Sequence, residues 1–191
     1  MQKSWVMKDK IFKACLKAIE REGWKSFTFA KASQESGIPL SAFKKHFSSP
    51  ADVMIHLFQK IDKDVLEHHV ASENLSTKDR LFEILMERFD AATPYKPVLR
   101  RFWHDWLHTP DDFPSLACQG YSSMTWMLEA AGLNPRGISG ILRVQGLTTL
   151  YVLALRTWLD DDSPDLGKTM AFLDKGLSQM ERAAAWLNNF S

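Results

Sequence analysis

The sequence has little of what several classes of protein depend on. Only two of its 191 residues are cysteines, Cys15 and Cys118, which excludes a disulfide scaffold and favours a reducing compartment. No apolar run reaches the ~18 residues that a membrane span needs, and the first residues lack the apolar segment of a secretory signal. We therefore expect a soluble cytoplasmic protein with no integral membrane span.

Motifs of common enzymes are missing as well. The chain has no Gly-x-Ser-x-Gly, no glycine-rich phosphate loop and no dinucleotide fingerprint, so we expect no catalytic residues and no cofactor. His104 and His108 are four residues apart on a predicted helix, a spacing that can bind one metal ion. No glutamate follows the first histidine as in zinc proteases, and Trp103 and Trp106 interrupt the site. We therefore favour surface histidines and expect no metal.

Helical periodicity runs through almost the whole chain, and 45% of the residues are hydrophobic, enough for a core. The sequence predicts an all-α protein of about nine helices, with a three-helix head at residues 1–50 and a larger helical domain at 51–191. Thr28, Ser41 and Ser49 are predicted helix caps, Ser76 or Thr77 is predicted to open the fifth helix, and Ser163-Pro164 is a predicted start of the last helix. The predicted helices cover about 6–22, 29–36, 42–47, 50–70, 77–92, 97–107, 115–131, 137–159 and 165–187.

The near-neutral total charge conceals two regions of opposite sign. Residues 1–60 hold 11 Lys and Arg against five Asp and Glu, a formal charge of +6, which leaves −5 on the rest of the chain. Basic clustering is typical of proteins that neutralise nucleic-acid phosphates, although it also fits a solvated basic face without a partner. Asp160, Asp161 and Asp162 belong to the acidic region, and we expect them to form a charged, solvated turn that caps the last helix.

Three short helices, the second and third joined by a turn with Gly37, are the arrangement of a DNA-reading helix-turn-helix. Phe43 and Phe47 are four residues apart and are expected to face the core. That placement turns Lys44 and Lys45 outward, where they can contact phosphates.

The same region resembles the N-terminal domain of TetR-family transcriptional regulators. Several elements carry the resemblance: Gly23-Trp24, Phe27-Thr28, Ser36-Gly37-Ile38 and His46-Phe47-Ser48-Ser49. It implies a homodimeric repressor that binds a double-stranded DNA operator and responds to an apolar small-molecule ligand. The residues at its DNA-facing positions are Thr28, Lys31, Ser41, Ala42, Lys44, Lys45 and His46. Ala42 and Lys44 depart from the family pattern, which usually has a hydroxyl-bearing residue and a tyrosine there.

The C-terminal region has a second resemblance, which leaves an alternative function open. Lys78–Asp90 and the segment Trp158-Leu159-Asp160-Asp161-Asp162-Ser163 are similar to the TetR-fold accessory proteins of ubiquinone biosynthesis. Such proteins bind lipid and have lost DNA binding. The alternative is therefore a lipid- or isoprenoid-binding accessory protein of quinone biosynthesis with a vestigial helix-turn-helix.

Two sets of apolar residues are candidates for binding. One set could line an apolar cavity between helices or simply fill the core: Phe82, Met86, Phe89, Phe102, Trp103, Trp106, Met124, Met127 and Tyr151. The last two predicted helices carry more apolar surface than one core face needs, which favours a four-helix dimer interface over two central core helices. The residues predicted for that interface are Leu142, Leu150, Leu155, Trp158, Phe172, Leu173, Leu177 and Met180.

Overall fold

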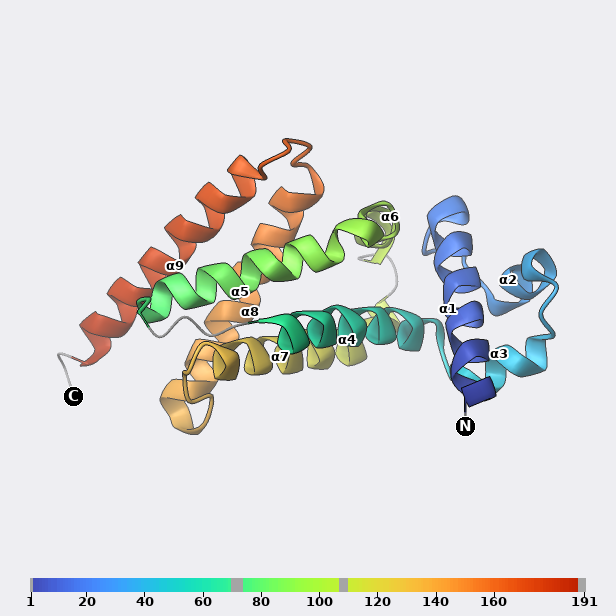
Figure 1. Cartoon of the computed structure of the whole chain (residues 1–191), viewed down its shortest axis with the longest axis horizontal. Helices are drawn as coiled ribbons and strands as arrows, with labels where there is room; N and C mark the ends of the chain where they lie inside the picture. The colour runs from blue at the N-terminus through green and yellow to red at the C-terminus, as the bar shows by residue number, and fades with distance from the viewer. Residues whose placement is uncertain (1, 70–73, 107–109, 189–191) are drawn as a thin grey trace. The chain divides into compact units, whose positions relative to one another are not determined.

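A computed structural model describes residues 2–69, 74–106 and 110–188, with side chains placed for 5–69, 74–105 and 111–183. Every secondary-structure element in these ranges is helical, which confirms the all-α prediction (Figure 1). The nine α-helices are α1 (Gln2–Glu22), α2 (Phe29–Ser36), α3 (Leu40–His46), α4 (Pro50–His68), α5 (Thr77–Ala92), α6 (Lys96–Trp106), α7 (Phe113–Ala130), α8 (Gly137–Leu159) and α9 (Gly167–Asn188). Two short 3₁₀ turns, Thr93–Tyr95 and Pro110–Asp112, precede α6 and α7.

The chain forms two compact units, and their division differs from the predicted boundary at residue 50. The head unit comprises residues 1–59 and 94–119, and the body unit comprises 60–93 and 120–191. The difference arises because α6 packs on the N-terminal helices: Phe102 lies edge-on against Trp24, with ring centroids 5.1 Å apart. The division falls within α4, whose first half belongs to the head unit and whose second half belongs to the body unit.

The core of the head unit is apolar and rich in aromatic rings. Ile11, Cys15 and Ile19 recur along one face of α1 and are fully buried. Burial raises the pKa of the Cys15 thiol to about 12, so this thiol stays protonated and unreactive at neutral pH. Phe43 of α3 is also fully buried, so α3 is anchored by its apolar side and leaves its polar side outward.

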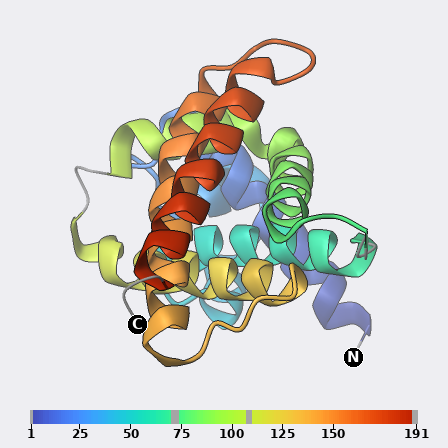
Figure 2. The same cartoon turned by 90° about the vertical axis from the view of Figure 1, so that its left-hand side faces the viewer.

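In the body unit α8 and α9 are antiparallel and lie side by side (Figures 1 and 2). Small residues allow the close approach: a Cβ at Gly176 would overlap Leu150, and one at Gly146 would press on Met180. By length and composition alone α8 could cross a membrane, with a third of its most apolar window buried. A single such helix is weak evidence, because core helices share these properties.

Several helix ends follow the predicted caps. Thr28 and Ser76 accept the backbone N–H groups of Lys31 and Asp79, at 3.3 and 3.1 Å. The Ser49 hydroxyl likewise accepts the N–H of Asp52 at 3.3 Å, ahead of Pro50 at the first position of α4. These three predictions are confirmed.

Two predicted helix starts are wrong. Ser41 does not cap α3, because the helix begins at Leu40 and the carbonyl of Pro39 accepts its first N–H, from Ala42. Ser163-Pro164 does not begin the last helix either, because α9 starts at Gly167. As predicted for the aspartate turn, Asp161 caps that helix by accepting the backbone N–H and the hydroxyl of Thr169, at 2.9 and 2.8 Å, but it is buried rather than solvated.

Candidate functional site

The turn between α2 and α3 has the geometry that a helix-turn-helix requires. Gly37 ends α2 with φ of 67°, a left-handed conformation that costs glycine little. The Ser33 hydroxyl donates to the carbonyl of Ile38 at 2.6 Å and fixes the chain just after the turn. Phe43 and Phe47 are buried as predicted, so Lys44 and Lys45 are exposed side by side on the opposite face of α3.

The residues predicted to contact DNA have two kinds of environment. Ser41, Lys44 and Lys45 are exposed on α3, whereas Ala42 and His46 are half-buried there. On α2, the Lys31 ammonium donates to the carbonyl of Ser26 at 2.9 Å and lies 3.6 Å from a carboxylate oxygen of Glu22. Lys44 and Lys45 are therefore better placed for phosphate contact than Lys31, because neither makes such an internal ion pair.

A contact that sequence reasoning missed holds the turn between α1 and α2 in the head unit. Asp105 of α6 accepts the backbone N–H of Lys25 at 3.3 Å, and its carboxylate lies against Gly23. A hydrogen bond from His104 and then those from the Lys25 and Trp24 backbone lower the pKa of Asp105, against the effect of partial burial. Gly23 has φ of 84°, so this position needs glycine for its conformation as well as for space.

A second missed feature is a buried polar cluster in the body unit, named here the core cluster: Asp62, Arg88, Ser123 and Tyr151. Each residue comes from a different helix, α4, α5, α7 and α8. The Arg88 Nε–H donates to Asp62 Oδ1 at 2.8 Å, and the Ser123 hydroxyl donates to Asp62 Oδ2 at 2.5 Å. The Arg88 guanidinium carbon is 4.5 Å from the centroid of the Tyr151 ring.

Burial and charge act in opposite directions on Arg88. Burial alone would lower the pKa of its guanidinium, but interactions with Tyr151 and with the Asp62 carboxylate raise the pKa overall. For Tyr151 burial dominates and raises its pKa, although the positive charge of Arg88 acts against it. Arg88 is therefore charged and Tyr151 is neutral at pH 7. The available signal in the sequence was Arg88, an arginine on the apolar face of α5. Helical periodicity places it on that face but does not identify the residues that it contacts.

The predicted cavity residues divide between the two units. Phe102 and Trp103 lie in the head unit, where Phe102 also packs near Phe58, and the side chain of Trp106 lies outside the described residues. The others are in the body unit. There Phe89 stacks on Tyr151 and on Trp158, with ring centroids 5.0 and 5.5 Å apart. The body-unit members of the predicted set are Phe82, Met86, Phe89, Met124, Met127 and Tyr151.

The predicted dimer residues require a correction. Trp158, Leu173, Leu177 and Leu150 are buried within one chain, so they cannot reach a partner subunit. Of the remaining four, Leu142 and Phe172 are exposed, and Leu155 and Met180 are half-buried. The predicted set includes buried residues because α8 is apolar on both sides, and periodicity alone does not say which side packs inward. An interface through the exposed members stays a prediction.

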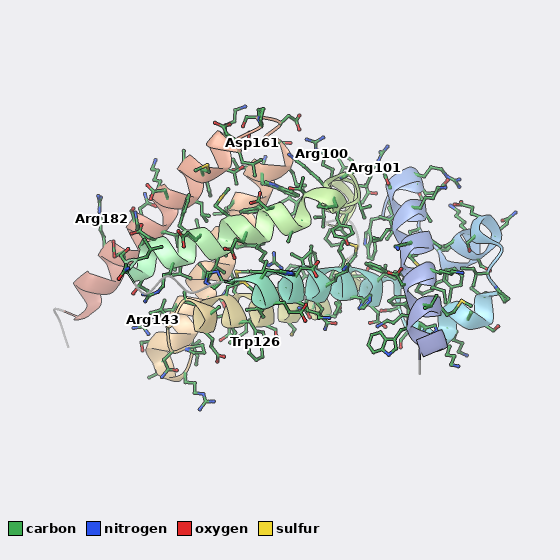
Figure 3. All side chains as sticks on the ribbon, in the orientation of Figure 1. Arg100, Arg101, Trp126, Arg143, Asp161 and Arg182 are labelled. Carbon is green, nitrogen blue, oxygen red and sulfur yellow. The ribbon has the colours of Figure 1, made fainter. Side chains whose placement is uncertain are left out.

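The other face of α8 is an exposed apolar surface. It consists of two groups of residues on one side of the helix, separated by the exposed polar residues Gln145 and Thr149. The apolar residues, named here the α8 stripe, are Ile138, Ile141, Leu142, Val152 and Leu153, and Ile138 is 82% exposed. Trp126 projects separately from α7 (Figure 3).

The histidines gave no metal site in the part of the chain that the structure describes. No group of three or more potential ligands is present among those residues. His104 is exposed and pairs with Asp105 at 2.9 Å, whereas His108 lies outside the described residues. The expected absence of metal therefore stays a prediction.

The fold is known from solved structures. No family model and no curated protein matches the sequence. The chain resembles the crystal structure of a TetR transcriptional regulator from Nitrosomonas europaea with a TM-score of 0.72 and 19% identity, over 94% of this chain and 98% of that one. It also resembles a TetR transcriptional regulator from Rhodococcus sp. RHA1 with a TM-score of 0.67 and 11% identity, over 93% and 96%.

At this level of sequence identity, the similarities establish the fold of the chain. The chain has the all-α fold of TetR regulators along nearly its whole length, from the helix-turn-helix to α9. The similarity to ubiquinone accessory proteins is not tested by these structures and stays a prediction.

Proposed function

We propose that the chain is a homodimeric, DNA-binding regulator of transcription, acting in the cytoplasm as a repressor. The observation that carries the proposal is the exposed pair Lys44 and Lys45 on a helix held by two buried phenylalanines. A rigid, basic face on the second helix of a helix-turn-helix suits the major groove and its phosphates. TetR-fold neighbours that are transcriptional regulators support the same function.

The test begins with selection of bound fragments from a random duplex library and continues with a salt titration on the selected duplex. Each lost phosphate contact lowers the slope of log affinity against log salt by about 0.9. With one contact in each of two heads, Lys44→Ala lowers the slope by about 2 and weakens binding to all sequences alike. Lys175→Ala, at an exposed lysine of α9, is the matched control and leaves the slope unchanged. An unchanged slope in the Lys44 variant contradicts the proposal.

The α8 stripe supplies the dimer contact in this proposal. Exposed aliphatic side chains on one side of a helix are what a symmetric helix pair buries, and two heads are needed to bind two half-sites. Replacing Ile141 and Leu142 with Glu makes the protein monomeric in sedimentation velocity experiments. Trp126→Glu is the control, because Trp126 is equally exposed but lies on α7. A dimeric Ile141/Leu142 variant contradicts this interface.

A small apolar ligand is the proposed regulator of DNA binding. The support is the set of aromatic and methionine side chains in the body unit, since methionine adapts to varied ligands. The α4 helix is continuous between the two units, so a ligand that favours one arrangement of the body unit can shift the population of DNA-competent heads. Absence of any enzymatic activity belongs to the same proposal, and turnover of a defined substrate contradicts it.

A further inference from the structure

The helix-turn-helix has one large apolar side chain that its core does not bury. Within residues 29–46, all of which the structure describes, Leu40 is the only large hydrophobic residue that is exposed, and it is 48% exposed. Phe43 on the same helix is fully buried, and Ile38 just before the helix is half-buried. A single exposed leucine is common on protein surfaces, so its place in the molecule decides what it can do.

Leu40 lies on the side of α3 that is proposed to meet DNA. It precedes Lys44 by four residues, a spacing that places the two side chains next to each other along a helix. Ser41 and Lys45 are exposed beside them and are also four residues apart. The exposed side of α3 therefore combines two ammonium groups and a hydroxyl, which suit phosphates and polar base edges, with one aliphatic side chain, which suits neither.

The backbone around Leu40 is fixed by hydrogen bonds. The Ser33 hydroxyl donates to the carbonyl of Ile38 at 2.6 Å, just before the helix. The carbonyl of Pro39 accepts the N–H of Ala42 at 2.9 Å, across the position of Leu40. Leu40 is therefore presented from an ordered turn, so little backbone freedom is lost when a partner covers its side chain.

The major groove of DNA offers one apolar group, and only one base carries it. Thymine presents its C5-methyl group there, whereas the edges of adenine, guanine and cytosine present hydrogen-bond donors and acceptors. A leucine side chain cannot pair with those polar atoms, and covering them removes them from water without replacing their hydrogen bonds. At the base that it faces, Leu40 therefore favours thymine and disfavours cytosine, which has an amino group and no methyl group.

We propose that Leu40 is a specificity-determining residue, which selects one thymine in each half-site by covering its C5-methyl group. The inference rests on the proposed function, because it names a base that the helix-turn-helix reads in the duplex. Lys44 and Lys45 supply affinity for any sequence through the phosphates, and Leu40 adds a preference among sequences. Burial of a methyl-sized group corresponds to about fourfold in affinity, which sets the size of the preference in each half-site.

The test replaces thymine with deoxyuridine, which differs only in lacking the C5-methyl group. Selection from a random duplex library gives the preferred half-site, and each symmetry-related pair of thymines is then substituted in turn. Binding of the full-length protein is measured by fluorescence anisotropy at one fixed salt concentration. At one of these positions deoxyuridine weakens binding of the unmodified protein by about fourfold for each half-site. In Leu40→Ala the same substitution changes the affinity less than twofold, because the methyl group has lost its partner.

Two further variants serve as controls. Leu66→Ala is the matched control, because Leu66 is 37% exposed but lies on α4 in the body unit, and it keeps the full deoxyuridine effect. Leu40→Met also keeps the effect, since methionine is apolar and of similar volume. The inference is overturned if no deoxyuridine position weakens binding of the unmodified protein, or if the effect is equally large in Leu40→Ala.

A second selection gives an independent readout. With Leu40→Ala the library no longer enriches thymine at the contacted position, whereas the rest of the half-site is selected as before. Enrichment of thymine at the same position by this variant contradicts the inference.

The failure of this inference is distinguishable from that of the proposed function. Salt-dependent duplex binding without a deoxyuridine effect that depends on Leu40 overturns only the thymine contact. Absence of salt-dependent binding to any duplex overturns the proposed regulator, and the thymine contact with it.

Discussion

The two units of this molecule use their charges in opposite ways. The head unit has 13 Lys and Arg against eight Asp and Glu, and its described lysines and arginines are at least partly exposed. The body unit has 11 against 15. All five buried polar residues found among the described residues are in the body unit: Asp62, Arg88, Ser123, Asp161 and Thr169.

The difference separates two uses of polar groups. Charges at the surface remain available to a partner and contribute little to stability, since water already solvates them. Buried charges are costly unless every partner is in place, so they fix which helices meet and where. The head unit is therefore suited to an external polyanion, and the body unit to a precise internal arrangement.

Breaking the ion pair of the core cluster has the largest expected effect. Arg88→Met leaves the Asp62 carboxylate buried without its cation, and it lowers the free energy of unfolding by about 3–5 kcal/mol. Arg101→Met in the head unit changes it by less than about 0.5 kcal/mol. Urea unfolding followed by circular dichroism measures both. Equal effects would show that the two units do not differ in their use of charge.

Substitution of Asp161 has an intermediate expected effect on the free energy of unfolding, and that effect depends on pH. Figure 3 shows this carboxylate at the turn between α8 and α9. Burial acts to raise its pKa, but hydrogen bonds from Ser163 and Thr169 together lower it well below the ordinary value of 3.8. A lowered pKa contributes stability that is present above the unfolded-state pKa and is lost as the pH falls through the folded-state pKa.

Asp161→Asn therefore lowers the free energy of unfolding by about 1–3 kcal/mol at neutral pH. The gap between the variant and the unmodified protein stays constant down to about pH 4 and narrows below it, because protonation weakens the same bonds in the unmodified protein. Urea unfolding at a series of pH values measures the gap. A gap that does not narrow in acid would assign the effect to packing instead. Asp105→Asn is the comparison in the head unit, where the more exposed carboxylate gives a smaller change.

Gly23→Ala gives the smallest of the three effects and tests a backbone constraint in the head unit. The left-handed φ of 84° and the contact with Asp105 both oppose a Cβ, so unfolding becomes easier by about 1 kcal/mol. Thermal unfolding measures the change. Introducing Gly23→Ala into an Asp105→Ala background separates the two causes. A loss of stability that persists in that background comes from the backbone conformation of residue 23. A loss that disappears comes from the contact with the Asp105 carboxylate.

Most of the head could be predicted from local patterns. The caps Thr28 and Ser49, the turn at Gly37 and the inward phenylalanines follow from interactions within a few residues, which sequence spacing records. Ser41 failed as a cap because two local solutions competed, and the helix begins two positions earlier, after Pro39. Asp105 could not be found this way, since its partner Lys25 is 80 residues distant in the chain.

In the body unit the amino-acid sequence determined the helices, including both ends of α8, but not what they face. A helix that is apolar all round has no preferred side until its neighbours are placed, and so Trp158 and Leu173 proved to be core rather than interface. The partnership of Asp62, Arg88, Ser123 and Tyr151 was decided only by the tertiary structure. Charges so far apart along the chain are brought together by helix packing, which excludes the water that would otherwise solvate each of them.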